Sequence, residues 1–206
     1  IKDTDIVDSN IDHTNNKNVE PTFLRLSLNT AVSAGFNFRD IPVALCASVS
    51  LRLTLSKHFT LNITGIIPTI PITLSEPEGS VDIKTGLVSL GFDLLLLPQQ
   101  TPVQVFTGIG AGPLFFRMRG AAAQTYISKD ANILVALPNM SLGLSVRLNN
   151  LVSIRGDWLL GFAVQRPVVK MLDRNIAILA RPLSFIALGI EVKLSKYKKS
   201  ITTSTR

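Results

Sequence analysis

The stretch VALCASVSLRLTLS, residues 43–56, decides the fold of this chain. Every second residue from Val43 to Leu55 is Val, Leu or Ala, and the intervening residues are Ala44, Cys46, Ser48, Ser50, Arg52, Thr54 and Ser56. Because side chains alternate between the two faces of a β-strand, this pattern predicts a strand with one apolar face and one small or polar face. Alternation alone does not say which face meets water.

The same alternation recurs along the chain and predicts eight strands. They cover approximately residues 23–36, 43–56, 59–74, 81–97, 103–117, 133–148, 152–165 and 186–194. In the third segment, Pro68 and Pro71 indicate a bulge or a slipped register. Shorter and longer connections alternate, which is typical of an up-and-down barrel that carries its short turns and both termini on one rim. The predicted fold is therefore all-β, an eight-stranded antiparallel up-and-down transmembrane β-barrel.

The polar face carries the charges, five basic and three acidic: Arg25, Arg52, Asp93, Arg147, Arg155, Asp157, Glu191 and Lys193. Placed inside, these residues and their small neighbours fit a narrow lumen and pair as a closed polar network, since a buried charge needs a partner. The Leu, Ile and Phe of the other face would overfill an eight-stranded interior. We therefore predict a lipid-facing apolar surface that includes Leu26, Leu51, Leu142, Leu160 and Ile190. A soluble ligand-binding barrel is the alternative.

Composition supports the membrane interpretation. Hydrophobic residues make up 46% of the chain and charged residues 17%, against about 25% charged in an average soluble domain. The longest uncharged run, residues 94–116, contains three prolines and does not read as a transmembrane helix. The net charge of +7 is scattered, with no basic helical stripe and no aromatic RNA-binding motif, so we expect no nucleic-acid partner.

Charged tails flank the predicted barrel. Residues 1–20 form a largely acidic N-terminal tail, residues 21–195 the barrel, and residues 196–206 a basic C-terminal tail. Neither tail shows periodic apolar residues, so we expect both to be disordered or extended in the free protein and to emerge into the periplasm. The tails and the external loops are candidate docking segments for protein partners.

Catalytic chemistry has little support in the sequence. Of the two histidines, His13 lies in the N-terminal tail and His58 in a predicted short turn, away from an external nucleophile. No His, Cys, Asp and Glu spacing fits a metal site, and the single Cys46 is interpreted as a buried small hydrophobe. We expect no catalytic residues, no metal and no cofactor, with an outer-membrane lipid-modifying enzyme as the alternative.

Two segments resemble the small eight-stranded outer-membrane barrels, the group of the OmpA transmembrane domain, OmpW-like and opacity proteins. VFTGIGAGPLFF, residues 105–116, is similar to their strand with glycine at alternate positions, here Gly108, Gly110 and Gly112. ALGIEVKL, residues 187–194, resembles their terminal insertion signal, with a longer tail and no terminal Phe. The resemblance implies an integral protein of the bacterial outer membrane surrounded by lipid. We expect a non-enzymatic anchor or subunit of a larger envelope assembly.

Overall fold

The computed structural model describes residues 23–37, 43–77, 79–97, 101–122, 130–165, 167–171, 174–178 and 182–198. Its elements are β1 (Phe23–Asn37), β2 (Ala44–Thr54), β3 (Phe59–Pro68), β4 (Ile72–Glu76), β5 (Gly79–Leu95), β6 (Val103–Ala122), β7 (Ala131–Arg147), β8 (Val152–Gly161), β9 (Val168–Met171), β10 (Arg174–Ile178) and β11 (Leu183–Lys198). Among these described residues, no helix is long and apolar enough to span a membrane.

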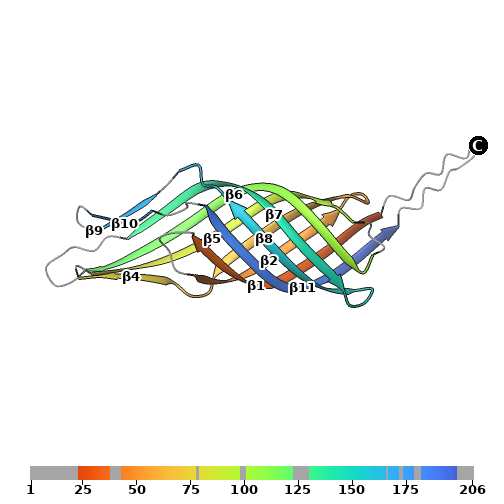
Figure 1. Ribbon diagram of the computed structural model, residues 1–206, viewed down its shortest axis with the longest axis horizontal. Helices are drawn as coiled ribbons and strands as arrows, with labels where there is room; N and C mark the ends of the chain where they lie inside the picture. The colour runs from red at the N-terminus through yellow and green to blue at the C-terminus, as the bar shows by residue number, and fades with distance from the viewer. Residues whose placement is uncertain are drawn as a thin grey trace, which may run out of the picture.

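Antiparallel pairing closes the sheet into a barrel (Figure 1). The order is β3-β2-β1-β11-β8-β7-β6-β5-β4, and β3 also pairs with β5. β3 and β4 pair in turn with the two ends of β5, so they form one interrupted strand and the barrel has eight. The interruption lies between Pro68 and Pro71, where the sequence predicts it. The predicted fold class is confirmed.

Alternation of the side chains is retained in the barrel. Along β2, buried and exposed residues alternate without exception from Ala44 to Arg52. The buried positions face the lumen and the exposed positions face outward, so Leu51 is 41% exposed while Arg52 is 6% exposed. The apolar face of the deciding stretch is therefore the outer face of the barrel.

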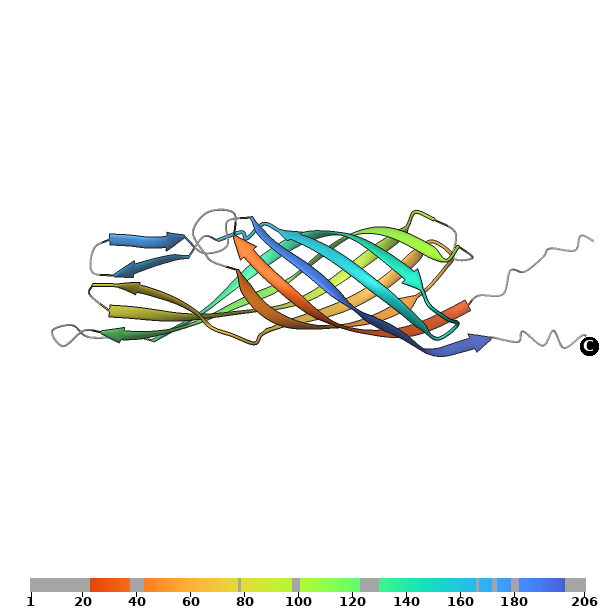
Figure 2. The ribbon, with the colours of Figure 1, turned by 60° about the horizontal axis from the view of Figure 1, so that its bottom comes forward.

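The two rims of the barrel differ. Phe23, the first residue of β1, pairs with Lys198, the last residue of β11. The chain therefore enters and leaves the barrel at the same rim, which also carries the β2–β3, β5–β6 and β7–β8 turns. We call this the turn rim, and the opposite one the loop rim (Figure 2). β11 continues to Lys198, three residues beyond the predicted end of the barrel at 195. The predicted N-terminal tail, residues 1–20, and residues 199–206 of the predicted C-terminal tail 196–206 lie outside the described residues.

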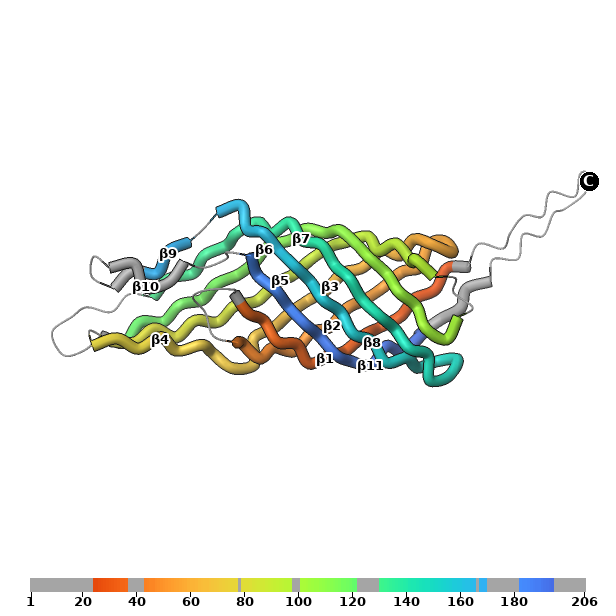
Figure 3. The backbone as a smooth tube through the Cα atoms, in the orientation of Figure 1, coloured from red at the N-terminus to blue at the C-terminus, as the bar shows by residue number. Residues whose placement is uncertain are grey.

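Strands extend well beyond the barrel at the loop rim. β4, residues 79–86 of β5 and residues 115–122 of β6 form a three-stranded sheet that we call the distal extension (Figure 3). β9 and β10 pair as a separate hairpin at the same end, within the connection between the predicted strands 152–165 and 186–194, where the sequence pattern predicts a loop. That interpretation was wrong because VVKM and RNIAI are too short to show a clear period.

Side-chain polarity inverts in the distal extension. Ile83, Phe116 and Met118 point to the inside and are at most 9% exposed, whereas Lys84 and Arg117 are exposed on the outside. Below the extension the outward residues of the same strands are apolar, as at Phe92 and Ile109. The outer surface therefore changes from apolar to charged as it leaves the barrel at the loop rim.

Candidate functional site: the barrel lumen

Five charged side chains meet in the lumen near the turn rim. They come from four strands and are Arg52 of β2, Asp93 of β5, Arg155 and Asp157 of β8, and Glu191 of β11. We call this group the ionic cluster. Asp93 is 1% exposed, Arg155 3% and Arg52 6%, so the arginines and the central carboxylate are withdrawn from bulk water.

Each arginine contacts more than one carboxylate. Arg52 Nη2 lies 3.1 Å from Asp93 Oδ2 and 3.4 Å from Asp157 Oδ1. Arg155 Nε lies 2.9 Å from Asp157 Oδ2, and its Nη1 lies 3.5 Å from Glu191 Oε2. Its Nη2 lies 3.9 Å from Asp93 Oδ2. Arg155 is therefore the one arginine of the cluster in contact with all three carboxylates.

Neutral side chains add hydrogen bonds to the three carboxylates. Ser27 Oγ donates to Glu191 Oε1 at 2.6 Å, and Ser141 Oγ donates to Asp93 Oδ1 at 3.3 Å. Asn29 Nδ2 donates to Asp157 Oδ2 at 3.5 Å. Charges buried in this way are tolerated because they are both paired and hydrogen-bonded.

Phe106 of β6 supports the two arginines. The guanidinium carbon of Arg155 lies 3.4 Å from the centroid of the Phe106 ring, and that of Arg52 lies 4.9 Å from it. Phe106 pairs across strands with Gly143, where an added Cβ would overlap the ring. Glycine at 143 therefore lets the aromatic ring lie against the barrel wall, where its face attracts both cations.

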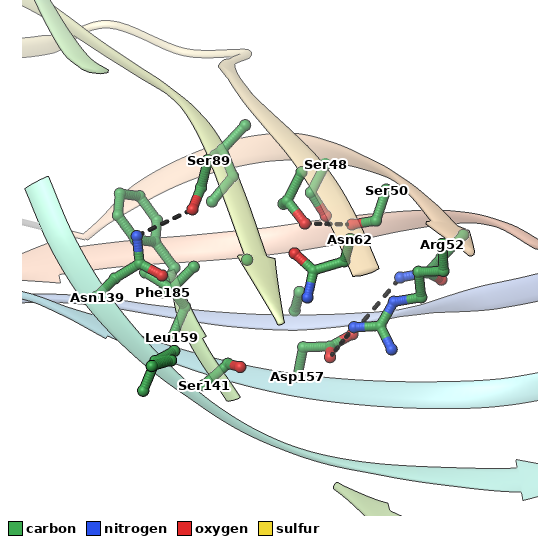
Figure 4. Close-up of a pocket in the computed structure, with 16 residues that line it drawn as sticks. Ser48, Ser50, Arg52, Asn62, Ser89, Asn139, Ser141, Asp157, Leu159 and Phe185 are labelled. Carbon is green, nitrogen blue, oxygen red and sulfur yellow. Dashed lines mark hydrogen bonds and ion pairs between the residues drawn. The ribbon is translucent and has the colours of Figure 1, made fainter. Parts of the chain in front are cut away.

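Hydroxyl and amide groups occupy the middle of the lumen (Figure 4). Ser50 and Thr64 share a hydrogen bond of 2.9 Å between their hydroxyl oxygens, and Asn139 Nδ2 donates to Ser89 Oγ at 2.9 Å. The space between these groups and Asp157 is about 40 Å³. Pockets for small-molecule ligands measure about 300 to 1,000 Å³. This cavity is too small for a substrate.

Apolar side chains fill the lumen toward the loop rim. Leu114 and Leu137 are 0% exposed, and Phe116 and Phe185 are 2% and 3% exposed. With their neighbours they form a continuous apolar cluster, which we call the apolar plug: Ala44, Cys46, Ile66, Ile72, Ile83, Leu87, Leu114, Phe116, Met118, Val135, Leu137, Val169, Leu183 and Phe185. Cys46 is buried here at 2% exposure, in the environment expected from its sequence position.

The structure brings together five of the eight charged residues singled out in the sequence. The other three, Arg25, Arg147 and Lys193, are half-buried at inward positions near the turn rim. The network thus occupies one end of the lumen rather than its whole length. Of the lipid-facing candidates, Leu51, Leu142 and Ile190 are 41%, 46% and 53% exposed, whereas Leu26 and Leu160 are half-buried at outward positions.

Sequence reasoning missed the apolar plug and the role of Phe106. A signal for the plug exists in PLFFRMRG, residues 113–120, where Arg117 and Arg119 alternate with Phe116 and Met118. Arg117 and Arg119 lie on the strand face that is apolar earlier in the same strand, as at Ile109. This change of face indicates where the side-chain polarity inverts. Phe106 gave no such signal, because its contacts with arginines of β2 and β8 depend on the closed barrel.

Across the described ranges, no group of three or more His, Cys, Asp and Glu side chains could hold a metal ion. His58 is exposed in the turn between β2 and β3 at the turn rim, and His13 lies outside the described residues.

No family model matches the chain, and no curated protein matches it. Solved structures do match. The Neisserial surface protein A aligns with a TM-score of 0.55 at 10% identity, over 83% of this chain and 97% of that protein. The N-terminal barrel domain of Pseudomonas aeruginosa OprF gives 0.51 at 10% identity, over 82% and 97%. A major outer membrane protein of Thermus thermophilus gives 0.53 at 13% identity, over 81% and 99%.

The chain has the fold of the small outer-membrane β-barrels. At these identities the likeness carries the fold and nothing finer. It agrees with the closed eight-stranded arrangement and with the resemblance noted in the sequence.

The ionic cluster predicts a strong and non-additive response to substitution. Arg155→Met leaves three carboxylates facing a single arginine and should lower the free energy of unfolding by about 3 to 5 kcal/mol. Adding Asp157→Asn restores the original charge balance and should recover part of that loss. Chemical denaturation of the refolded single and double variants in detergent measures this coupling.

Asp130→Asn serves as the control, because Asp130 is exposed. It should change the free energy of unfolding by no more than about 0.5 kcal/mol. Strict additivity of Arg155→Met and Asp157→Asn would contradict the cluster as an energetic unit.

Proposed function

We propose that this protein is an integral barrel of the bacterial outer membrane, without enzymatic activity, that acts as an anchor or subunit of a larger envelope assembly. One observation carries the proposal. Every strand of the barrel exposes large apolar residues on its outer face, including Val32, Val49, Ile63, Leu90, Ile109, Leu142, Ile154 and Leu188. We call this surface the apolar belt.

The height of the apolar belt fits a bilayer. On β6 the outward residues are uncharged from Val103 to Phe115, and on β7 from Leu134 to Val146. Thirteen residues of strand span about 40 Å, or about 30 Å along the barrel axis at a tilt of about 40°. In water the belt would far exceed the apolar patches that soluble monomers expose. A soluble ligand-binding barrel is correspondingly disfavoured.

Filling of the lumen supports a structural role over transport. In this proposal the ionic cluster closes one end of the lumen and the apolar plug closes the other, because both groups are buried inside the barrel. An interior of eight strands is just wide enough for its own side chains. A continuous water path would therefore need the ionic cluster, the apolar plug or both to rearrange. We therefore assign the barrel no conducting role.

Partners have two candidate attachment surfaces in this proposal. The distal extension and the β9–β10 hairpin project from the loop rim (Figure 2), and the charged tail sequences adjoin Phe23 and Lys198, which pair at the turn rim. A lipid-modifying enzyme remains the rival function. Such an enzyme needs a nucleophile and a base near the membrane surface. His58 lies at the turn rim, which this proposal places in the periplasm, away from an external nucleophile.

Insertion into a bilayer is tested by charge substitution in the apolar belt. Leu51→Arg or Leu142→Arg should lower the free energy of unfolding in lipid vesicles by about 2 to 4 kcal/mol, because each places a cation in hydrocarbon. Ser75→Arg is the matched control, since Ser75 is exposed on the distal extension. Equal tolerance of arginine at all three positions, or a wild-type chain that stays soluble without detergent, contradicts the membrane location.

Orientation is tested with single cysteines in a Cys46→Ser background. The proposal places both chain termini and the turn rim in the periplasm. A membrane-impermeant maleimide added to intact cells should label Ser75→Cys on the distal extension. It should label Asn150→Cys, in the β7–β8 turn, only after the outer membrane is permeabilised. The reverse labelling pattern contradicts the orientation.

The assembly role is tested by purification in mild detergent. A subunit should retain specific partner proteins that mass spectrometry identifies, and truncation of residues 1–20 or 199–206 should remove those partners bound through a tail. The purified barrel should also give no steady single-channel conductance in planar bilayers. Steady conductance contradicts the filled lumen, and modification of lipid A by the pure protein contradicts a non-enzymatic role.

A further inference from the structure

Three basic side chains gather on the outer face of the distal extension. Lys84 lies on β5, and Arg117 and Arg119 lie on β6, all exposed at outward positions. Together with Asp82 and Pro71 they line a cavity of about 210 Å³. We call these three cations the basic patch. It is separate from the lumen, because its side chains lie on the opposite face of the strands.

The strand register places two like charges directly opposite each other. Lys84 pairs across strands with Arg117, whereas Arg119 pairs with Asp82. Asp82 also accepts a hydrogen bond of 2.6 Å from Thr73 Oγ1. Directly opposed side chains have Cβ atoms about 5 Å apart, so the pairing of Lys84 with Arg117 is unfavourable without an anion.

Counter-ions for the patch are scarce nearby. Among the residues that the structure describes, none forms an ion pair with Lys84, Arg117 or Arg119 within 4 Å. Asp82 is the one carboxylate among the residues that line this cavity, against three cations, so the cavity carries an excess of positive charge. A phosphate group placed between Lys84 and Arg117 would convert the repulsion of the two cations into attraction for a shared anion.

The position of the basic patch along the barrel axis indicates which phosphate-bearing molecule it would meet. Gly86 and Phe115 are the next outward pair on the same two strands, two residues closer to the barrel. Phe115 is the last apolar residue of the belt on β6, and two residues of strand cover about 7 Å. The patch therefore lies just beyond the edge of the proposed hydrocarbon layer, at the level of the headgroups.

We propose that Lys84, Arg117 and Arg119 bind the phosphate of an anionic lipid whose acyl chains lie on the apolar belt. The inference rests on the proposed membrane location and deepens it by naming the lipid chemistry. A lipid phosphate is favoured over a soluble anion because the belt itself holds the lipid beside the patch. Its effective concentration there exceeds that of any free phosphate.

Native mass spectrometry of the full chain in dodecyl maltoside tests the site. The probes are dioleoyl phosphatidic acid and dioleoyl phosphatidylcholine. The wild-type protein should retain phosphatidic acid preferentially. Each cation near an anionic lipid contributes about a fivefold preference, so K84Q/R117Q should weaken phosphatidic acid binding about 25-fold. K57Q is the control, since Lys57 is exposed in the turn between β2 and β3 at the opposite rim, and it should bind as the wild type does.

A stability measurement separates binding from a structural role. In dodecyl maltoside without anionic lipid, K84Q should be at least as stable as the wild type, because it removes one of two opposed like charges. Adding phosphatidic acid should then raise the unfolding midpoint of the wild type more than that of K84Q. A K84Q protein that is destabilised in the absence of lipid would overturn the inference.

Other outcomes are equally decisive. Equal retention of the two lipids by the wild type, or full competition by inorganic phosphate, overturns a lipid site. Tighter binding of soluble dextran sulfate through Lys84 and Arg117 assigns the patch to a soluble polyanion and also overturns it. If the wild type fails to enter vesicles of either lipid, the proposed membrane location fails too. If it inserts without a phosphate preference, only this inference fails.

Discussion

Satisfaction of the backbone hydrogen bonds beneath an apolar surface is the constraint on which the rest of this structure depends. Amide and carbonyl groups facing hydrocarbon have no water to bind, so a sheet that crosses it must have no free edge. Here β3 and β5 pair over residues 59–66 and 87–94, which joins the two ends of the strand order. Closure with eight strands then fixes a narrow lumen, and a narrow lumen has to be filled.

The two ends of the lumen are filled by different physical means, and the ionic end also specifies strand register. Arg52 and Arg155 reach shared carboxylates only while β2, β5, β8 and β11 keep their present alignment. Because side chains alternate along a strand, a slip of one residue would turn Arg52 or Asp93 outward onto the apolar belt. Buried ion pairs add little stability over apolar packing. The charges at this end are therefore better explained by their effect on strand register than by their effect on stability.

Much of the fold could be predicted from the sequence, since the period of two survives along every long strand. The strand interruption at Pro68 and Pro71 was predictable because proline cannot donate a hydrogen bond to the ladder. The ionic cluster was only partly predictable. Alternation places Arg25 and Arg155 on the same face but does not give their heights in the barrel, which depend on the register of non-adjacent strands. The β9–β10 hairpin was not predictable from its short segments.

The apolar plug and the distal extension form one core, and this explains the inverted polarity at the loop rim. Ile83 and Phe116 of the extension belong to the same buried cluster as Leu137 and Phe185 of the barrel, and Val169 of β9 joins it. The extension is therefore built like a small soluble sheet, apolar inside and charged outside, and its core continues into the barrel. Apolar residues alone cannot locate the edge of the belt. In the barrel they cover the outer face, whereas in the distal extension they lie on the inner face. The charges locate it, since outward Lys84 and Arg117 follow directly on outward Gly86 and Phe115.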